Sequence, residues 1–135
     1  MAYEPIRVGI GGLGRSGWNI HARIFEELSG MYRVVAVADP LEGRRREAYA
    51  KFGCRTYEDF QGLTEDDDVE LVIVATPSYL HAPHTIAALE SGKDVVCEKP
   101  MASNLSEADA MIEASRRTGR MLTIFHNSLF APRLP

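Results

Sequence analysis

The sequence predicts a single α/β domain built on a doubly wound parallel sheet, the Rossmann arrangement. Short runs rich in valine and isoleucine alternate along the chain with longer stretches of helical period, which is typical of strands joined by crossover helices. A glycine-rich turn follows the first of these runs, in the position of a dinucleotide-binding fingerprint. At 135 residues the chain has the length of one domain with one core.

Six strands are expected, five of them clear and one weak. The clear strands are apolar at consecutive positions, as strands covered on both faces tend to be. They are expected at residues 6–10, 33–39, 69–76, 94–98 and 121–125, and the weak strand is expected near residues 54–56.

Helices are expected between these strands. Their expected ranges are residues 16–28, 42–52, 82–91 and 104–118. Ile20, Ile24 and Leu28 form the apolar stripe expected for the first helix, and Ala48, Tyr49 and Phe52 form that of the second. Pro83 and Gly92 suit the start and the end of the third helix. Asn104 and Glu107 have the spacing of a capping box at the start of the fourth.

Composition and charge argue against several classes of function. The net charge of -4 provides no basic field that would attract nucleic acid or an anionic membrane surface. The sequence has no apolar run of about 18 residues and no leader pattern at its start, so we expect a cytoplasmic protein without a membrane partner. Cys54 and Cys97 lack metal-ligand spacing, so buried thiols are expected and no metal site. The acidic segment at residues 64–70 is interpreted as a solvated loop without chemistry.

The glycine pattern GxGxxG occurs twice within residues 7–17. It can be read from Gly9, Gly11 and Gly14, or from Gly12, Gly14 and Gly17. A dinucleotide fingerprint must follow a strand and open a helix, because backbone N–H groups and the helix dipole hold the pyrophosphate. Gly9 lies inside the apolar run of the first strand, which places the first reading in mid-strand. The second reading is therefore expected to be the phosphate turn.

Each glycine of this turn has an expected role. Gly12 permits the tight turn, Gly14 lets the pyrophosphate approach the backbone, and Gly17 allows the helix to pack closely on the strand. Leu13, Arg15 and Ser16 stand between these glycines and are expected to belong to the same cofactor site. Gly9 and Gly11 are expected to be structural.

Asp39 ends the second expected strand, 27 positions after Gly12. Its carboxylate is expected to accept hydrogen bonds from the adenine-ribose hydroxyls, which favours NAD because a carboxylate repels a 2′-phosphate. A cap for the helix at residues 41–52 is a second, compatible role. Arg44 opens the RRR run, where it is expected either to reach a 2′-phosphate or adenine or to belong to a solvated basic helix face. NAD is the expected cofactor, and NADP stays open.

Residues 75–102 read ATPSYLHAPHTIAALESGKDVVCEKPMA. With this stretch, the sequence resembles the N-terminal nucleotide-binding domain of the Gfo/Idh/MocA oxidoreductase family, which includes glucose-fructose oxidoreductase and inositol dehydrogenase. The resemblance covers essentially the whole chain. It implies that Thr76, Pro77, Ser78 and His81 line the cofactor near its ribose and nicotinamide portions. Judged from the residues alone, His81 can instead be a structural histidine at the start of a helix. His21 and His84 are expected to be structural.

The EKP motif at residues 98–100 carries the chemistry that the resemblance implies. Hydride transfer at a carbinol carbon needs a group that exchanges the hydroxyl proton, and Lys99 is the expected catalytic residue. Glu98 is expected to orient Lys99 or to contact the nicotinamide ribose. Without the resemblance, Lys99 reads as a surface lysine and Glu98 as a strand-end cap.

The resemblance also implies that Asn127 closes over the cofactor. His126 either reaches the nicotinamide or is a histidine at the end of the sixth strand. Residues 1–125 are expected to form the dinucleotide-binding domain, and residues 126–135 the start of a connection to a C-terminal α+β substrate domain that the chain lacks. The expected function is hydride transfer between NAD(P) and a sugar, inositol or related polyol, with this chain alone catalytically incomplete. The alternative is a dinucleotide-binding module or fragment without turnover, acting as a sensor or regulatory subunit. An exposed apolar strand edge would favour a homo-oligomer.

Overall fold

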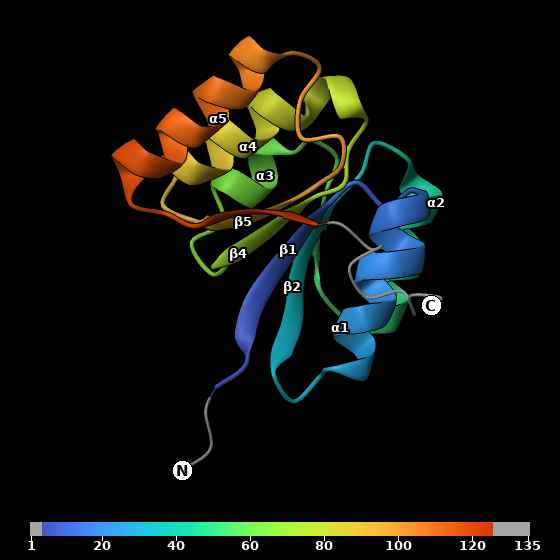
Figure 1. Ribbon diagram of the computed structural model, residues 1–135. Helices are drawn as coiled ribbons and strands as arrows, with labels where there is room; N and C mark the ends of the chain where they lie inside the picture. Colours follow the sequence, from blue (N-terminus) through green and yellow to red (C-terminus); the bar gives the residue numbers. More distant parts are fainter. Residues whose placement is uncertain (1–3, 126–135) are drawn as a thin grey trace, which may run out of the picture.

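A six-stranded parallel sheet forms the centre of the fold in the computed structural model, which describes residues 4–125 (Figure 1). The strands are β1 (Ile6–Gly11), β2 (Tyr32–Ala38), β3 (Arg55–Tyr57), β4 (Leu71–Val74), β5 (Asp94–Glu98) and β6 (Leu122–Phe125). Their order across the sheet is β3-β2-β1-β4-β5-β6, with every neighbouring pair parallel. This is the order of a doubly wound dinucleotide-binding sheet, so the predicted fold class is confirmed.

Helices cover both faces of the sheet (Figure 1). A π-helical turn (Gly17–Ala22) leads into α1 (Arg23–Glu27), which lies with α2 (Glu42–Phe52) on one face. The other face carries α3 (Gln61–Thr64), α4 (His81–Glu90) and α5 (Leu105–Thr118), and a 3-10 turn (Ser78–Leu80) precedes α4. All four residues of β4 are buried, which explains the unbroken apolar run that predicted this strand.

The predicted cap at the start of α5 is confirmed at Asn104, whereas the reciprocal contact of a capping box is made with the residue before it. The Asn104 side chain accepts a hydrogen bond from the Glu107 amide at 2.8 Å, and the Glu107 carboxylate accepts one from the Ser103 amide at 3.0 Å. These contacts satisfy amide groups that have no partner within the helix.

The predicted stripe of the first helical segment is wrong. Leu28 is 40% exposed, whereas His21, Ala22 and Phe25 are buried. The cause is the π-helical turn, whose wider winding shifts side chains out of the 3.6-residue period. In α2, Ala48 is buried as expected, but Tyr49 is 64% exposed because it lies on the neighbouring face of the helix.

Two short elements were not predicted, namely α3 and the 3-10 turn before α4. They have four and three residues, which is too short for a periodic pattern. Phe60, just before α3, and Tyr79, in the 3-10 turn, line the same cavity as the glycine turn.

Both cysteines, Cys54 and Cys97, are free and buried, as predicted. Burial raises the pKa of each thiol to about 11, so neither is a reactive thiolate at neutral pH. Within residues 4–125 the structure has no group of side chains suited to hold a metal ion. In the same range, no helix has the length and apolar character needed to cross a membrane.

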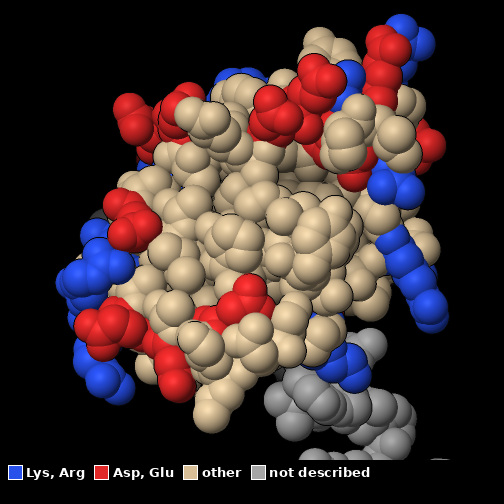
Figure 2. All heavy atoms as spheres, turned by 90° about the horizontal axis from the view of Figure 1, so that it is seen from above, with Lys and Arg blue, Asp and Glu red and all other residues tan. Residues whose placement is uncertain are grey.

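Charged side chains are dispersed on the face of the molecule drawn in Figure 2. Lysine and arginine alternate with aspartate and glutamate around its margin, and the middle of the face is uncharged. This face therefore presents no continuous basic surface.

Candidate functional site

The turn after β1 begins at Gly12 and requires glycine at two positions. Gly12 has a φ of +90°, and a Cβ atom there would lie 2.5 Å from the Ala75 carbonyl oxygen. A Cβ atom at Gly17 would overlap the Gly12 carbonyl oxygen, so the π-helical turn packs directly on the end of the strand. A Cβ atom at Gly14 would meet nothing closer than the Arg44 guanidinium, at 3.7 Å. Packing therefore leaves the backbone at Gly14 open to the approach of a ligand.

The upstream glycines serve packing inside the sheet. Gly9 and Gly11 both lie within β1. A Cβ atom at Gly11 would lie 2.5 Å from the Phe60 ring, and one at Gly9 would lie 3.0 Å from Val69. The glycine reading that places the turn at Gly12 therefore agrees with the backbone.

A cavity of about 510 Å³ opens at the carboxyl ends of the strands, beside this turn. This is where open α/β sheets bind ligands, at the point where the strand order reverses between β1 and β4. Eight of the predicted cofactor residues line the cavity, namely Gly12, Gly14, Arg15, Ser16, Asp39, Arg44, Thr76 and Pro77. Leu13 and Gly17 are buried beside it.

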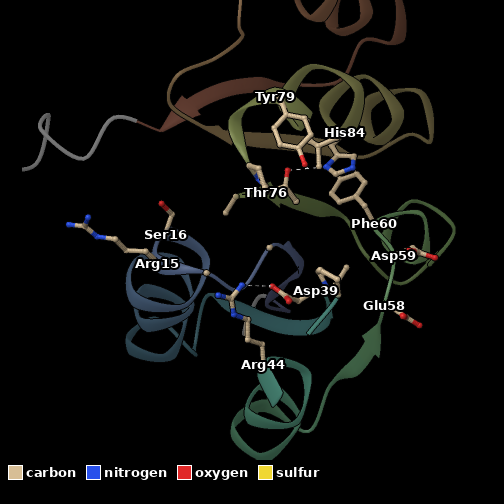
Figure 3. Close-up of a pocket in the computed structure, with 17 residues that line it drawn as sticks. Arg15, Ser16, Asp39, Arg44, Glu58, Asp59, Phe60, Thr76, Tyr79 and His84 are labelled. Carbon is tan, nitrogen blue, oxygen red and sulfur yellow. Dashed lines mark hydrogen bonds and ion pairs between the residues drawn. The ribbon is translucent and has the colours of Figure 1, made fainter. Parts of the chain in front are cut away.

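Asp39 is held rigidly on one side of the cavity (Figure 3). Its side chain is 3% exposed, and its two carboxylate oxygens accept hydrogen bonds from the Leu13 and Leu41 amides, both at 2.8 Å. The Arg44 guanidinium lies 3.4 Å from the same carboxylate. Asp39 thus anchors the phosphate turn and the start of α2 while it lines the cavity, so the two roles expected for it are compatible.

His81 lies behind the opposite wall of the cavity. It is 2% exposed, its Nδ1 lies 2.7 Å from the Pro100 carbonyl oxygen, and its Nε2 lies 2.8 Å from the Thr76 carbonyl oxygen. These contacts join the segments that follow β4 and β5. Direct contact between His81 and a cofactor stays a prediction.

Glu98 and Lys99 leave the end of β5 in different environments. Glu98 is 7% exposed, and its Oε1 lies 2.5 Å from Nε2 of His21, which is also buried. Lys99 is exposed and, among residues 4–125, has no hydrogen bond or ion pair; its peptide bond to Pro100 is cis. Neither residue lines the cavity beside Asp39. The predicted residues Asn127 and His126 lie outside the described range.

Comparison with known proteins agrees with this geometry. The sequence model of an oxidoreductase family with an NAD-binding Rossmann fold, GFO_IDH_MocA, matches residues 6–126. The chain belongs to the Gfo/Idh/MocA oxidoreductase family. The glycine turn and its sheet are therefore those of an NAD-binding Rossmann domain, and the predicted family and cofactor class are confirmed.

Similar proteins include an inositol dehydrogenase, a ketoreductase solved with NADP and a dehydrogenase solved with NADH. The chain is 34% identical over 125 residues to the scyllo-inositol 2-dehydrogenase (NADP(+)) IolW of Bacillus subtilis, a match that covers 92% of this chain and 34% of the relative. KijD10, a 3-ketoreductase of Actinomadura kijaniata solved with NADP and TDP-benzene, is 31% identical, with a TM-score of 0.88 over 96% of this chain and 40% of the other. The WlbA dehydrogenase of Bordetella pertussis, solved with NADH and UDP-GlcNAcA, is 27% identical, with a TM-score of 0.85 over 90% of this chain and 37% of the other. The chain thus spans about a third of the curated relative's length.

Sequence reasoning missed the aromatic wall that faces Asp39 in this family member (Figure 3). Tyr79, His84 and Phe60 line the cavity, and the His84 and Phe60 rings are stacked with centroids 4.0 Å apart. The Thr76 hydroxyl lies 2.9 Å from Nδ1 of His84. Burial, reinforced by the nearby His81, lowers the pKa of His84, so its ring is neutral at neutral pH. The one available signal was the three-residue spacing from His81, which places both histidines in the first turn of α4.

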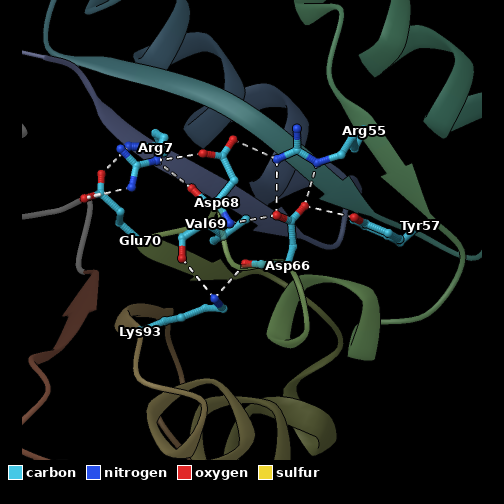
Figure 4. A network of polar contacts seen from close by, with 8 residues as sticks. All are labelled: Arg7, Arg55, Tyr57, Asp66, Asp68, Val69, Glu70 and Lys93. Atoms are coloured by element: carbon cyan, nitrogen blue, oxygen red, sulfur yellow. Dashed lines mark hydrogen bonds and ion pairs between the residues drawn. The ribbon is translucent and has the colours of Figure 1, made fainter.

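The charged cluster that precedes β4 is structural (Figure 4). Asp66 is 6% exposed on its side chain and accepts hydrogen bonds from Arg55 at 2.7 Å and Tyr57 at 2.9 Å. The buried Lys93 ammonium donates to the Asp66 and Val69 carbonyl oxygens at 2.8 and 3.0 Å. The interpretation of residues 64–70 as a solvated loop is therefore wrong at Asp66. Arg55 lies 11 residues earlier, in a strand of only three residues. Nothing in the sequence indicates that it pairs with Asp66.

Replacing Asp66 by asparagine should remove a pH-dependent part of the stability. Burial alone would raise the pKa of Asp66, but hydrogen bonds from Arg55, Tyr57 and the Asp68 amide outweigh it and hold the pKa below the ordinary value of 3.8. Because the pKa of Asp66 is lower in the folded than in the unfolded chain, its ionised carboxylate stabilises the fold above pH 3.8. This contribution is lost as the pH falls through the pKa of the folded state. We expect Asp66→Asn to lose about 1–2 kcal/mol at pH 7 and progressively less below pH 4. Urea unfolding from pH 7 to pH 3 measures this difference.

The exposed Asp109 on α5 provides the control for this measurement. Asp109→Asn should leave the pH dependence of unfolding as it is in the original chain. An Asp66→Asn loss that stays constant from pH 7 to pH 3 would show that the charge of Asp66 does not stabilise the fold.

Proposed function

We propose that this chain binds a nicotinamide dinucleotide along the carboxyl edge of its sheet and takes part in hydride transfer to or from a sugar, inositol or related polyol. One observation carries the proposal: the glycine turn and the buried Asp39 carboxylate face a single cavity at the switch point of the sheet. Backbone atoms leave no room for a Cβ atom at Gly12 or Gly17, and these are two of the glycines that a phosphate turn needs. The inositol dehydrogenase activity of one relative and the UDP-GlcNAcA bound to another support the substrate class.

The residues present fit the cofactor. The backbone at Gly14 and the start of the helical segment would hold the pyrophosphate, and Asp39 would accept from the adenine-ribose hydroxyls. The neutral, stacked His84 and Phe60 rings provide an apolar wall that suits adenine. When bound, the nicotinamide ring supplies the hydride chemistry.

Lys99 is proposed as the proton-exchanging residue. In the oxidation of a carbinol, the carbon would give its hydride to the oxidised nicotinamide while Nζ of Lys99, in its uncharged amine form, accepts the hydroxyl proton; in reduction the Lys99 ammonium would return that proton to the oxygen. The exposure of Lys99 at the end of β5 leaves its Nζ accessible to a substrate. Glu98, fixed on the neighbouring position, would orient the lysine or accept from the nicotinamide ribose.

A second candidate is dinucleotide binding without turnover. Within residues 4–125, no carboxylate, hydroxyl or imidazole group contacts Lys99. The described site thus contains groups for a cofactor but only one group for proton exchange. A sensor or regulatory module would need only the groups that bind the cofactor.

Two measurements on the full chain separate these functions. NADH fluorescence titration tests binding, and absorbance at the NADH band with a panel of sugars and inositols tests turnover. If turnover is found, we expect Lys99→Ala to reduce it by about a hundredfold or more, the scale of general acid–base catalysis, and to leave NADH affinity within about twofold.

Lys51 provides the control, because it is paired with Glu26 away from the cavity. Lys51→Ala should retain turnover. Full turnover in Lys99→Ala would refute the catalytic assignment, and NADH binding without turnover on the whole panel would favour the second candidate. Failure to bind NADH or NADPH would overturn both.

A further inference from the structure

The Glu98 carboxylate depends on one side chain from a distant part of the chain. Glu98 is 7% exposed, and a buried carboxylate is costly unless hydrogen bonds compensate for its lost hydration. Within residues 4–125, its carboxylate has one donor, Nε2 of His21, at 2.5 Å and 77 positions away in the sequence. The second oxygen, Oε2, has no protein donor in this range. This oxygen is therefore open to solvent or to a ligand hydroxyl.

His21 is built to donate this hydrogen bond. Its side chain is 3% exposed, and the Phe125 ring packs against it with centroids 4.6 Å apart. Burial lowers the pKa of His21 more than Glu98 raises it, so the ring is neutral at neutral pH. In that state Nε2 carries the ring proton and donates it to Oε1 of Glu98.

The position of His21 connects two parts of the proposed site. It lies on the π-helical turn that starts at Gly17, the residue packed against the Gly12 carbonyl. π-helical turns place side chains where an α-helix would not, and they are frequent at functional sites. The same element thus contacts the phosphate turn at one end and Glu98 at the other.

The segment that contains Lys99 is also held at its far end. The Pro100 carbonyl oxygen lies 2.7 Å from Nδ1 of His81, which is buried. Lys99 itself is exposed and makes no hydrogen bond or ion pair with residues 4–125. Its position is therefore determined by its two neighbours, Glu98 and Pro100.

We propose that His21 is a positioning residue for the nicotinamide end of the cofactor site: it fixes the Glu98 carboxylate and, through it, the backbone that presents Lys99. The inference rests on the proposed function, because it assigns Glu98 and Lys99 to the nicotinamide end. It adds a residue that neither the glycine turn nor the EKP motif contains. If the pair of His21 and Glu98 were merely structural, its loss would lower the stability of the fold and weaken the binding of all ligands to the same degree.

Three variants at position 21 separate positioning from stability. His21→Leu removes the donor, His21→Gln retains an amide donor near the position of Nε2, and His21→Asn has the same chemistry but a shorter reach. Phe25→Leu is the matched control, because Phe25 is buried one turn further along and does not contact Glu98. If His21→Leu does not fold, the comparison of His21→Gln with His21→Asn still distinguishes a positioning role of His21 from a structural one.

The affinities for NADH and ADP give the first readout. ADP carries the adenosine and two phosphates but lacks the nicotinamide riboside. We expect His21→Leu and His21→Asn to bind NADH about tenfold more weakly, the effect of one lost hydrogen bond to a charged group, and to bind ADP within about twofold of the original chain. His21→Gln should recover most of the NADH affinity. Equal losses for NADH and ADP, or no loss for either, would overturn the proposal.

Resonances of the ligand-free protein give the second readout. The Glu98 carboxyl carbon and the Lys99 amide should shift in His21→Leu and His21→Asn and return toward their original positions in His21→Gln. Unchanged Glu98 and Lys99 resonances in the variants that lack the donor would refute positioning. This readout stays decisive if the chain binds no NADH, a result that would overturn the proposed function separately.

Discussion

The Gly17→Ala variant is expected to lose NADH binding and to unfold more easily by about 3 kcal/mol. The added methyl group would overlap the carbonyl oxygen of Gly12, and that neighbour is backbone rather than a flexible side chain. The overlap is relieved only if the π-helical turn moves away from the end of β1. This movement would displace both the phosphate turn and His21.

Gly43→Ala provides the control for this variant. Position 43 lies in α2, and a Cβ atom there meets no atom within 4 Å. Alanine should therefore stabilise the helix by about 0.5–1 kcal/mol and leave NADH affinity unchanged. Urea unfolding and NADH titration of both variants measure the two effects. Original NADH affinity in Gly17→Ala would show that close packing at Gly17 is not needed to shape the cofactor site.

The strands and the glycine turn were predictable because their signals are local. The strand at Asp94–Glu98 has the predicted bounds, since its apolar positions are consecutive and the acidic ends mark its limits. Gly9 could be excluded from the turn because it stands within an apolar run. Asp39 was predictable from its place at the end of the second strand.

The residues that were missed depend on distant contacts. His21 reads as a helix residue of no special kind, and only the π-helical winding brings it to a glutamate 77 positions away. His84 and Phe60 stack on one wall of the cavity although they come from separate parts of the chain. Asp66 reads as one of several acidic residues in a row until folding places Arg55 beside it. No period or spacing in the sequence encodes these pairs.

We propose that the choice between NAD and NADP depends on the opposite charges of Asp39 and Arg44, which lie 3.4 Å apart. The buried Asp39 carboxylate favours ribose hydroxyls and repels a 2′-phosphate. The Arg44 guanidinium, 46% exposed on its side chain, is free to turn from Asp39 toward a phosphate group. Because both amide donors to Asp39 come from the backbone, the carboxylate stays fixed when Arg44 moves. The geometry thus favours NAD and leaves a route to NADP through Arg44.

Asp39→Ala should therefore weaken NAD binding more than NADP binding, and Arg44→Ala should have the opposite effect. For Asp39→Ala we expect about a thirtyfold loss for NAD, the scale of hydrogen bonds to a charged group, and a clearly smaller loss for NADP. Titration of each variant with NADH and NADPH gives the ratio of the two affinities. This ratio cancels any loss of stability that arises when the Leu13 and Leu41 amides lose their acceptor.

Arg46→Ala is the matched control for Arg44, because Arg46 lies on the same helix, pairs with Glu42 and does not line the cavity. Its ratio of NADH to NADPH affinity should equal that of the original chain. If Asp39→Ala instead weakened NADPH more than NADH, Asp39 would not be the ribose-binding group. If Arg44→Ala left the ratio unchanged, Arg44 would serve only to neutralise Asp39, and the preference for NAD would come from the carboxylate alone.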